Sequence, residues 1–110
     1  MKADGGLTTK ALMYLATCQD IWAERRNSGK VPVGKGWVLL GEEGTPDICG
    51  YLRRPGRYAL PFGLETKRLK GKLNDNQKRW HAKAEAWGIP VFKCDSLRQV
   101  IEAIVALREM

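Results

Sequence analysis

The sequence is poor in the residues from which small domains build disulfide scaffolds or zinc sites. It has 110 residues, of which three are cysteines and one is a histidine. Cys18, Cys49 and Cys94 are far apart and outside any Cys-x-x-Cys or Cys/His ligand pattern. This odd, scattered set excludes a disulfide framework and a zinc finger. We expect the three thiols to be small buried groups in a reducing cytoplasm.

Long apolar runs are missing as well. No stretch approaches the length of about eighteen residues that a membrane-spanning helix needs. The N-terminus, with Asp4, Gly5 and Gly6, lacks the apolar segment of a signal peptide. These absences predict a cytoplasmic protein, in a bacterial or phage-infected cell, with no membrane partner.

Acidic residues are the third deficit. Lysine and arginine number 19 against 12 aspartates and glutamates, so the formal net charge is +7. A surplus of this size favours a polyanionic partner such as nucleic acid.

The hydrophobic pattern predicts one α/β domain over residues 1–110, without repeats or linkers. We expect a helix capped by Thr8 or Thr9, strands at 21–26, 37–40, 48–52 and 58–67, and a strand at 90–94. Asn74 or Asp75 should cap a helix that ends at about 87 with Trp87 on its inward face, and Ser96 should cap a last helix with Ile101 on its core face. The segment 27–36 reads as a turn-rich loop. Pro61 and Gly63 predict an interruption or bulge in the fourth strand. The continuous apolar run at 90–94 is typical of a strand in parallel pairing.

Two short segments point to metal chemistry. Asp47 follows a proline, and Glu65-Thr66-Lys67 comes eighteen residues later. On a strand, Glu65 and Lys67 share one face and Thr66 lies on the other. Two carboxylates can hold a hydrated Mg²⁺, and an ammonium can orient one of its waters for attack on phosphorus. The alternative interpretation is an ordinary cross-face ion pair.

Basic residues crowd the segment that follows. Between 67 and 83 they face the single acid Asp75, and they are Lys67, Arg68, Lys70, Lys72, Lys78, Arg79 and Lys83. Such a run binds phosphates if it faces one way. Otherwise it is a solvated loop and helix face. His81 lies among these residues without a Ser, Cys or Asp partner, so we interpret it as a surface histidine rather than a general acid or base.

The order and spacing of these features resemble the VRR-NUC domain, a family of the PD-(D/E)xK nuclease superfamily whose stand-alone members are often carried by phages. The matching features are Gly44-Thr45-Pro46-Asp47-Ile48, Glu65-Thr66-Lys67, the lysine-rich loop, Leu73, Gln77, Trp80, and Gly88 before Val91-Phe92. Arg25-Arg26-Asn27-Ser28-Gly29 is similar to the family's first strand. The similarity spans roughly residues 8 to 105.

The resemblance implies a nuclease-like mixed central β-sheet flanked by α-helices. In that family's chemistry, Asp47, Glu65 and the backbone carbonyl of Thr66 would hold Mg²⁺ or Mn²⁺. Lys67 would be the catalytic lysine with Gln77 beside it, although Gln77 is equally read as a satisfied amide on the helix face. The expected DNA contacts are Arg25, Asn27, Arg68, Lys70, Lys72, Lys78, Arg79 and Lys83.

The implied activity is a structure-selective DNA endonuclease acting on four-way junctions or other branched DNA. Symmetric cleavage of a junction needs two active sites, so we expect a homodimer. Trp22, Trp37 and Tyr51 are candidates for the contact between protomers, or else core residues. The alternative function is a DNA-binding module that keeps the fold and does not cleave.

One departure from the family concerns the metal site. The family usually has a glutamate early in its first helix, whereas this chain has Leu7-Thr8-Thr9-Lys10 there. Glu24, Glu42 and Glu43 are the acids that could substitute, with a solvated loop pair as the alternative for the last two.

Overall fold

The secondary structure follows the hydrophobic periodicity of the chain. The computed structural model describes residues 6–26, 29–40, 43–68 and 71–110, and for 29–33 and 36–40 it describes the backbone only. In chain order the elements are α1 (Leu7–Ala16), β1 (Ile21–Arg25), β2 (Gly29–Val33), β3 (Gly36–Leu40), β4 (Ile48–Leu52), β5 (Leu60–Thr66), α2 (Asp75–Ala86), β6 (Val91–Cys94) and α3 (Leu97–Arg108).

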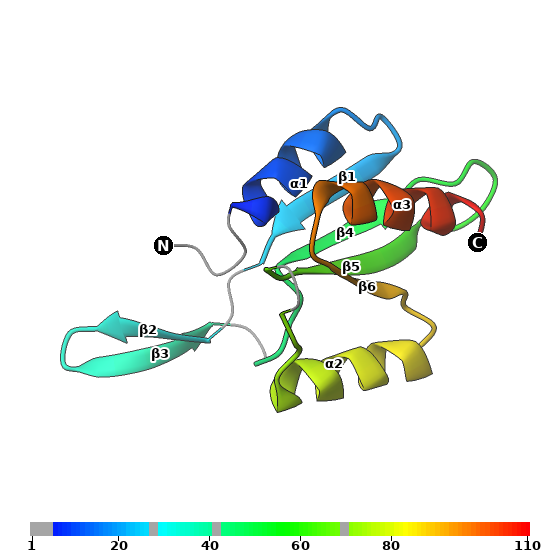
Figure 1. The fold of residues 1–110 in the computed structure, drawn as a ribbon. Helices are drawn as coiled ribbons and strands as arrows, with labels where there is room; N and C mark the ends of the chain where they lie inside the picture. The colour runs from blue at the N-terminus through cyan, green and yellow to red at the C-terminus, as the bar shows by residue number, and fades with distance from the viewer. Residues whose placement is uncertain (1–5, 27–28, 41–42, 69–70) are drawn as a thin grey trace.

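Four strands form a mixed sheet in the order β1-β4-β5-β6. The β1-β4 and β4-β5 pairs are antiparallel, and β5-β6 is parallel. The parallel pair requires a crossover connection, which α2 supplies. Helices α1 and α3 cover one face of the sheet and α2 lies over the other (Figure 1). The predicted α/β domain with a mixed sheet between helices is therefore confirmed, and the finer assignment to the nuclease superfamily stays a prediction.

The hydrophobic core lies between the sheet and the pair α1 and α3. Alternate residues of β4 and β5 point into it, and the fully buried members include Ile48, Leu64, Val100, Ile104 and Leu107. The α3 helix begins at Ser96, whose hydroxyl accepts the backbone N–H of Gln99, as its sequence predicts.

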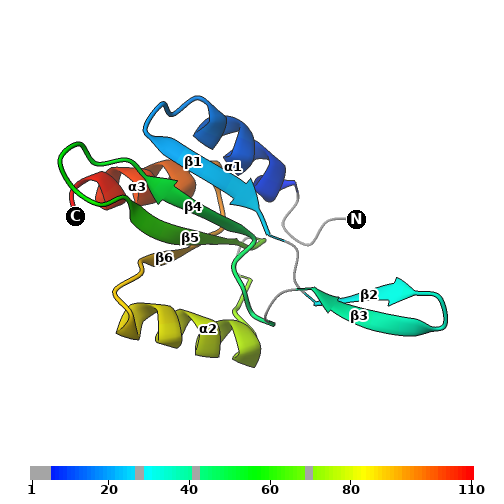
Figure 2. The ribbon, with the colours of Figure 1, turned by 180° about the vertical axis from the view of Figure 1, so that it is seen from behind.

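The segment predicted as a turn-rich loop contains a β-hairpin. Strand β2 pairs with β3 in antiparallel register from Gly29↔Leu40 to Val33↔Gly36. The connection is a two-residue turn in which Gly34 has φ 58, a left-handed conformation that glycine adopts readily. The prediction failed because Pro32 argues against a strand, yet proline is tolerated in a two-stranded ribbon with free edges. Figure 2 shows this hairpin extending away from the main sheet.

The predicted bulge in β5 is wrong. Pairing with β4 is regular from Ile48↔Leu64 to Leu52↔Leu60. Gly63 donates its N–H to the carbonyl of Pro90 at 3.0 Å, on the side of β5 that faces β6. The nitrogen of Pro61, two residues earlier on the strand, points to the same side. Strand β6 starts only opposite Gly63. Pro61 therefore lies where β5 has no neighbour that needs its N–H.

The helix ends and faces differ from the sequence predictions in three places. Helix α1 already begins at Leu7, after Gly6 with φ 87, so neither threonine is its cap. Ile101 of α3 and Trp87 after α2 were expected to face inward, yet they are 38% and 76% exposed. The cap of α2 at Asn74 is confirmed. Within the described residues, no helix combines the length and apolarity needed to cross a membrane.

Candidate active site

Two close backbone approaches fix the segment that carries Asp47. Gly44 has φ 90, and a Cβ there would collide with the carbonyl oxygen of Asn76 in α2. Pro46 is fully buried, and a Cβ on Gly63 would lie 2.9 Å from its Cγ. The two glycines therefore let the chain pack tightly against α2 and β5. This packing places Asp47 directly before β4, one residue beyond the Ile48↔Leu64 pair.

Asp47 is held by the end of β5. Its Oδ2 accepts hydrogen bonds from the backbone N–H and the hydroxyl of Thr66, both at 3.0 Å. The Thr66 hydroxyl in turn lies 2.5 Å from the hydroxyl of Thr8 in α1. Thr8 lies within α1, and its side chain is buried. Helix α1 therefore contributes a hydroxyl to this end of the sheet, in the region where the resemblance implies a glutamate.

The backbone carbonyl of Thr66 points toward Asp47. Lys67 donates its N–H to the carbonyl of Cys94 in β6 at 2.8 Å. The C=O of the same peptide points the opposite way, which is toward β4 and Asp47. The carbonyl is thus on the side where the resemblance implies a metal ligand.

Glu65 is buried on the opposite face of β5 from Thr66. Its side chain is 1% exposed, and within the described residues its Oε1 has no hydrogen-bond partner. Burial first, and then the hydrogen bond and charge of Asp47, raise the pKa of Glu65 to about 9 against the opposing charge of Lys67. A shift of this size marks a carboxyl that lacks the cation it would need to ionise.

His81 of α2 faces this carboxyl, so the predicted surface position is wrong. Its side chain is 17% exposed, and its Nε2 lies 3.8 Å from Glu65 Oε1. This Nε2 is also buried and unbonded in the described structure. Burial, then the charge of Lys67, lowers the pKa of His81. Both groups are therefore driven toward their neutral forms, and the close approach is not an ion pair.

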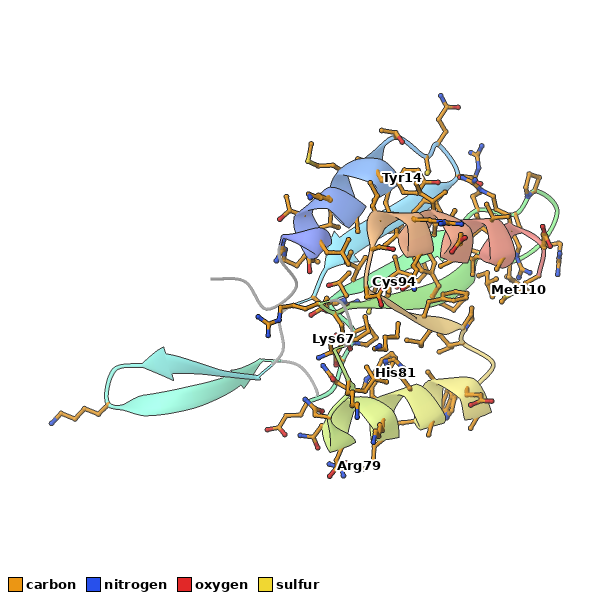
Figure 3. All side chains as sticks on the ribbon, in the orientation of Figure 1. Tyr14, Lys67, Arg79, His81, Cys94 and Met110 are labelled. Carbon is orange, nitrogen blue, oxygen red and sulfur yellow. The ribbon has the colours of Figure 1, made fainter. Side chains whose placement is uncertain are left out.

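Sequence reasoning missed Thr8 and His81 because their roles depend on tertiary position. Figure 3 shows His81 on the side of α2 that faces the sheet, with Lys67 between that helix and the strands. Gln77 has a structural role: its Oε1 accepts the backbone N–H of Asn74 at 2.9 Å in a capping box. This hydrogen bond favours the interpretation of Gln77 as a satisfied amide over its interpretation as a residue of the catalytic site.

Of the acids proposed as substitutes, the two that the structure describes do not reach the site. Glu43 accepts a hydrogen bond from the Asn76 side chain at 2.6 Å and is exposed. Glu24 is exposed on β1, which β4 separates from β5. Glu42 lies outside the described residues.

The predicted DNA contacts divide into two groups. Arg25 ends β1 at the Asp47 end of the sheet, and the neighbouring Arg26 donates its N–H to the Asp47 carbonyl at 2.7 Å. Arg68 and Lys72 are exposed beyond β5, and Lys78 lies three residues before His81 on a nearby side of α2. Asn27 and Lys70 lie outside the described residues.

Arg79 and Lys83 form the second group. Each is two residues from His81, which turns it about 200° around the helix. Figure 3 accordingly shows Arg79 on the side of α2 away from the sheet. The basic run therefore does not face one way, as a single phosphate-binding surface would require.

The site residues fit a divalent cation in donor chemistry. Carboxylate and carbonyl oxygens suit Mg²⁺ and Mn²⁺, and imidazole suits transition metals rather than Mg²⁺. Within the described residues, no three His, Cys, Asp or Glu side chains already converge as a metal cluster. Glu65 instead lies between Asp47 on one side and His81 on the other. Its unbonded Oε1 is the atom that a cation would satisfy.

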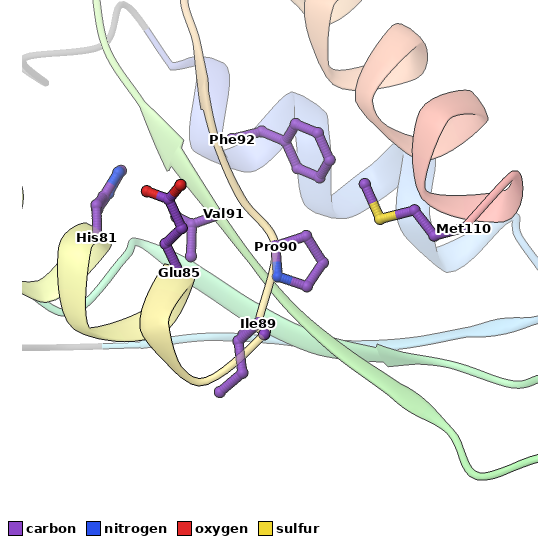
Figure 4. Close-up of a pocket in the computed structure, with 8 residues that line it drawn as sticks. His81, Glu85, Ile89, Pro90, Val91, Phe92 and Met110 are labelled. Carbon is purple, nitrogen blue, oxygen red and sulfur yellow. The ribbon is translucent and has the colours of Figure 1, made fainter.

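A hollow lies next to this site and has different chemistry. It measures about 480 Å³ between α2, β6 and the C-terminus, and it is lined by His81, Glu85, Gly88, Ile89, Pro90, Val91, Phe92 and Met110 (Figure 4). Only His81 belongs to both. The mostly apolar walls make it a poor phosphate site, and we do not place the chemistry there.

Comparison with protein-family models, curated proteins and solved structures finds no match to this chain. The resemblance to VRR-NUC therefore stays a prediction from the residues. Function must be inferred from the geometry of the site.

Proposed function

We propose that this protein is a metal-dependent endonuclease that hydrolyses DNA phosphodiester bonds. The observation that carries the proposal is the pairing of Asp47 with the buried carboxyl of Glu65, whose Oε1 is unbonded, followed by Lys67 directly after β5. A buried carboxyl with a strongly raised pKa destabilises a fold, so its presence favours a functional role.

The roles of the individual residues follow from their positions. Asp47, Glu65 and the Thr66 carbonyl would hold the cation, and the N–H and hydroxyl of Thr66 fix the Asp47 carboxylate. When bound, Mg²⁺ or Mn²⁺ would supply a water of lowered pKa as the nucleophile. Lys67 would orient the attacking water and stabilise the negative charge that grows on the phosphoryl oxygens.

DNA is the proposed substrate because of the charge and its placement. The chain carries a net charge of +7, and Arg25 and Arg26 flank the Asp47 end of the sheet. Contacts of this kind position a phosphate backbone without reading bases. We therefore propose selectivity for DNA structure, such as a four-way junction, rather than for sequence.

A homodimer remains part of the proposal. Trp22 and Tyr51 are 66% and 43% exposed, and their rings pair at 5.4 Å on the face of the sheet away from the core. Trp37 lies in the hairpin, where side chains are not described. Light scattering of the full chain, with and without junction DNA, measures the oligomeric state directly.

The test is gel-resolved cleavage of labelled four-way junction, flap, single-stranded and linear duplex DNA with Mg²⁺ or Mn²⁺. Lys67→Ala should lower the cleavage rate by at least about 100-fold, because one electrostatic stabiliser of the transition state is lost. DNA affinity should stay within about twofold, since one charge of many is removed. Lys35→Ala, which removes a charge at the hairpin turn, is the matched control.

The outcome separates the two candidate functions. Metal-dependent cleavage that Lys67→Ala abolishes and Lys35→Ala retains supports the nuclease. Salt-sensitive DNA binding without cleavage would instead support a non-catalytic module, which the hydroxyl of Thr8 in place of a helix carboxylate favours. Full cleavage by Lys67→Ala would overturn the residue assignment.

A further inference from the structure

Two buried polar atoms without hydrogen-bond partners in the described structure face each other between β5 and α2. They are Glu65 Oε1 and His81 Nε2, and they are 3.8 Å apart. The separation is too long for a direct hydrogen bond. A buried polar group without a partner costs free energy, so two such atoms aimed at one point indicate a missing third species.

The position of His81 is fixed by the same contacts that place Asp47. The first turn of α2 is closed by the capping box between Asn74 and Gln77. Next to it, the backbone at Gly44 packs against Asn76 so closely that a side chain would not fit. These contacts fix the start of α2, the helix that carries His81, against the segment that carries Asp47.

We propose that His81 is a ligand of the cation held by Asp47 and Glu65, and that its nitrogen makes the site prefer Mn²⁺ to Mg²⁺. This inference rests on the proposed function, because it concerns the same cation. It adds a nitrogen ligand from α2 to the oxygen ligands of β4 and β5.

The distance between the two atoms suits a shared ion. Ligand bonds of about 2.1 Å put two donors about 3.0 Å apart at a right angle and about 4.2 Å apart when opposite. The observed 3.8 Å falls between these limits. The two donors are therefore close enough to share one cation. Within the described residues no third His, Cys, Asp or Glu side chain already converges on the same point, so Asp47 has to turn toward the ion when it binds.

The nitrogen sets the metal preference. Mg²⁺ prefers an all-oxygen octahedron and keeps several waters. Manganese shares with Mg²⁺ a preference for carboxylate oxygen, yet it belongs to the first-row transition metals, of which it is the weakest binder at sites with nitrogen ligands. Helix α1 offers no carboxylate in this region, only the hydroxyl of Thr8. A further side-chain ligand must therefore come from α2, where His81 is the side chain that faces Glu65.

The experiment measures metal binding by the full chain without DNA, so that it does not depend on cleavage. Mn²⁺ is titrated calorimetrically, and Mg²⁺ is titrated by displacement of bound Mn²⁺. His81→Gln should weaken Mn²⁺ binding by about 10- to 100-fold, as loss of a ligand-shell group does, and change Mg²⁺ binding by less than about threefold. Glu85→Gln, one turn further along the same helix, should change neither.

A spectroscopic measurement on the wild-type protein guards against a variant that folds poorly. Pulsed electron paramagnetic resonance of bound Mn²⁺ should show coupling to one imidazole nitrogen, and His81→Gln should lose it. Tight Mn²⁺ binding without nitrogen coupling overturns the inference and leaves the nuclease proposal standing if Asp47→Asn still abolishes binding. Failure of the wild-type chain to bind either ion overturns both.

Discussion

The two faces of the four-stranded sheet differ in whether their buried side chains are apolar or carry polar atoms without hydrogen-bond partners. Toward α1 and α3, Ile48 and Leu64 are fully buried in a continuous apolar core. Toward α2 lie the buried carboxyl of Glu65 and the partly buried imidazole of His81, each with one buried, unbonded atom, and within α2 only Ala84 is a buried residue. One strand, β5, serves both faces, because successive side chains alternate. Stability is concentrated on one side of β5 and candidate chemistry on the other.

The largest expected effect comes from the core face. Leu64→Ala should destabilise the protein by about 2–5 kcal/mol, because it removes buried methyl groups and leaves a cavity. Tyr51→Ala, on the opposite face of the neighbouring strand, should cost only about 1 kcal/mol, mainly from its ring contact with Trp22. Urea unfolding of both variants measures the difference. Equal losses would contradict the division between the faces.

The second effect is a pH dependence that arises on the other face. Because the pKa of Glu65 is raised to about 9, the folded protein keeps a proton that the unfolded chain releases. The stability of the protonated form is fully present below the ordinary carboxyl pKa, and it is lost as the pH rises through about 9. Between pH 7 and 8.5 the free energy of unfolding should therefore fall by at most about 2 kcal/mol.

The Glu65→Gln variant tests this origin. Without an ionisable group at position 65, its stability should be nearly constant from pH 7 to 8.5 in the presence of a chelator. The window lies above the range in which His81, whose pKa is lowered, changes its charge. Glu85→Gln, at an exposed position, should keep the wild-type slope. If Glu65→Gln also keeps that slope, another group binds the proton.

Most of the fold was predictable from local sequence signals. The strands around Ile48 and Val91, the Asn74 cap and the Ser96 cap all follow from periodicity and capping chemistry that neighbouring residues decide. The hairpin was missed because, among neighbouring residues alone, Pro32 argues against a strand more strongly than Val31 and Val33 argue for one. Residues 29–33 form a strand because they pair with β3.

The site was predictable only in part. Asp47, Glu65 and Lys67 could be singled out as candidates because their spacing carries a chemical pattern. Thr8 and His81 carry none, since a threonine in a helix and a histidine among lysines are ordinary in sequence. Their roles appear when α1 brings Thr8 to Thr66 and α2 brings His81 to Glu65. Such contacts between distant segments have no local signature.

The smallest effect concerns Thr66, the neighbour of Glu65 on the satisfied side of β5. Thr66→Val keeps the backbone N–H bond to Asp47 but removes the hydroxyl that contacts Asp47 Oδ2 and Thr8. We expect a loss of about 1 kcal/mol in urea unfolding, because buried partners lose a hydrogen bond. Thr17→Val, which removes an exposed hydroxyl bonded to the Tyr14 carbonyl, should cost less than about 0.5 kcal/mol.

The sign of the change in the free energy of unfolding also differs between the two faces. At pH 8.5, Glu65→Gln should stabilise the protein, since it removes a carboxyl that is costly to bury, whereas Thr66→Val should destabilise it. Adjacent residues of one strand would then respond in opposite directions to the loss of a polar group. A stabilising Thr66→Val would mean that the hydroxyl pair is strained rather than supportive. Asp47 would then depend on the Thr66 backbone N–H alone.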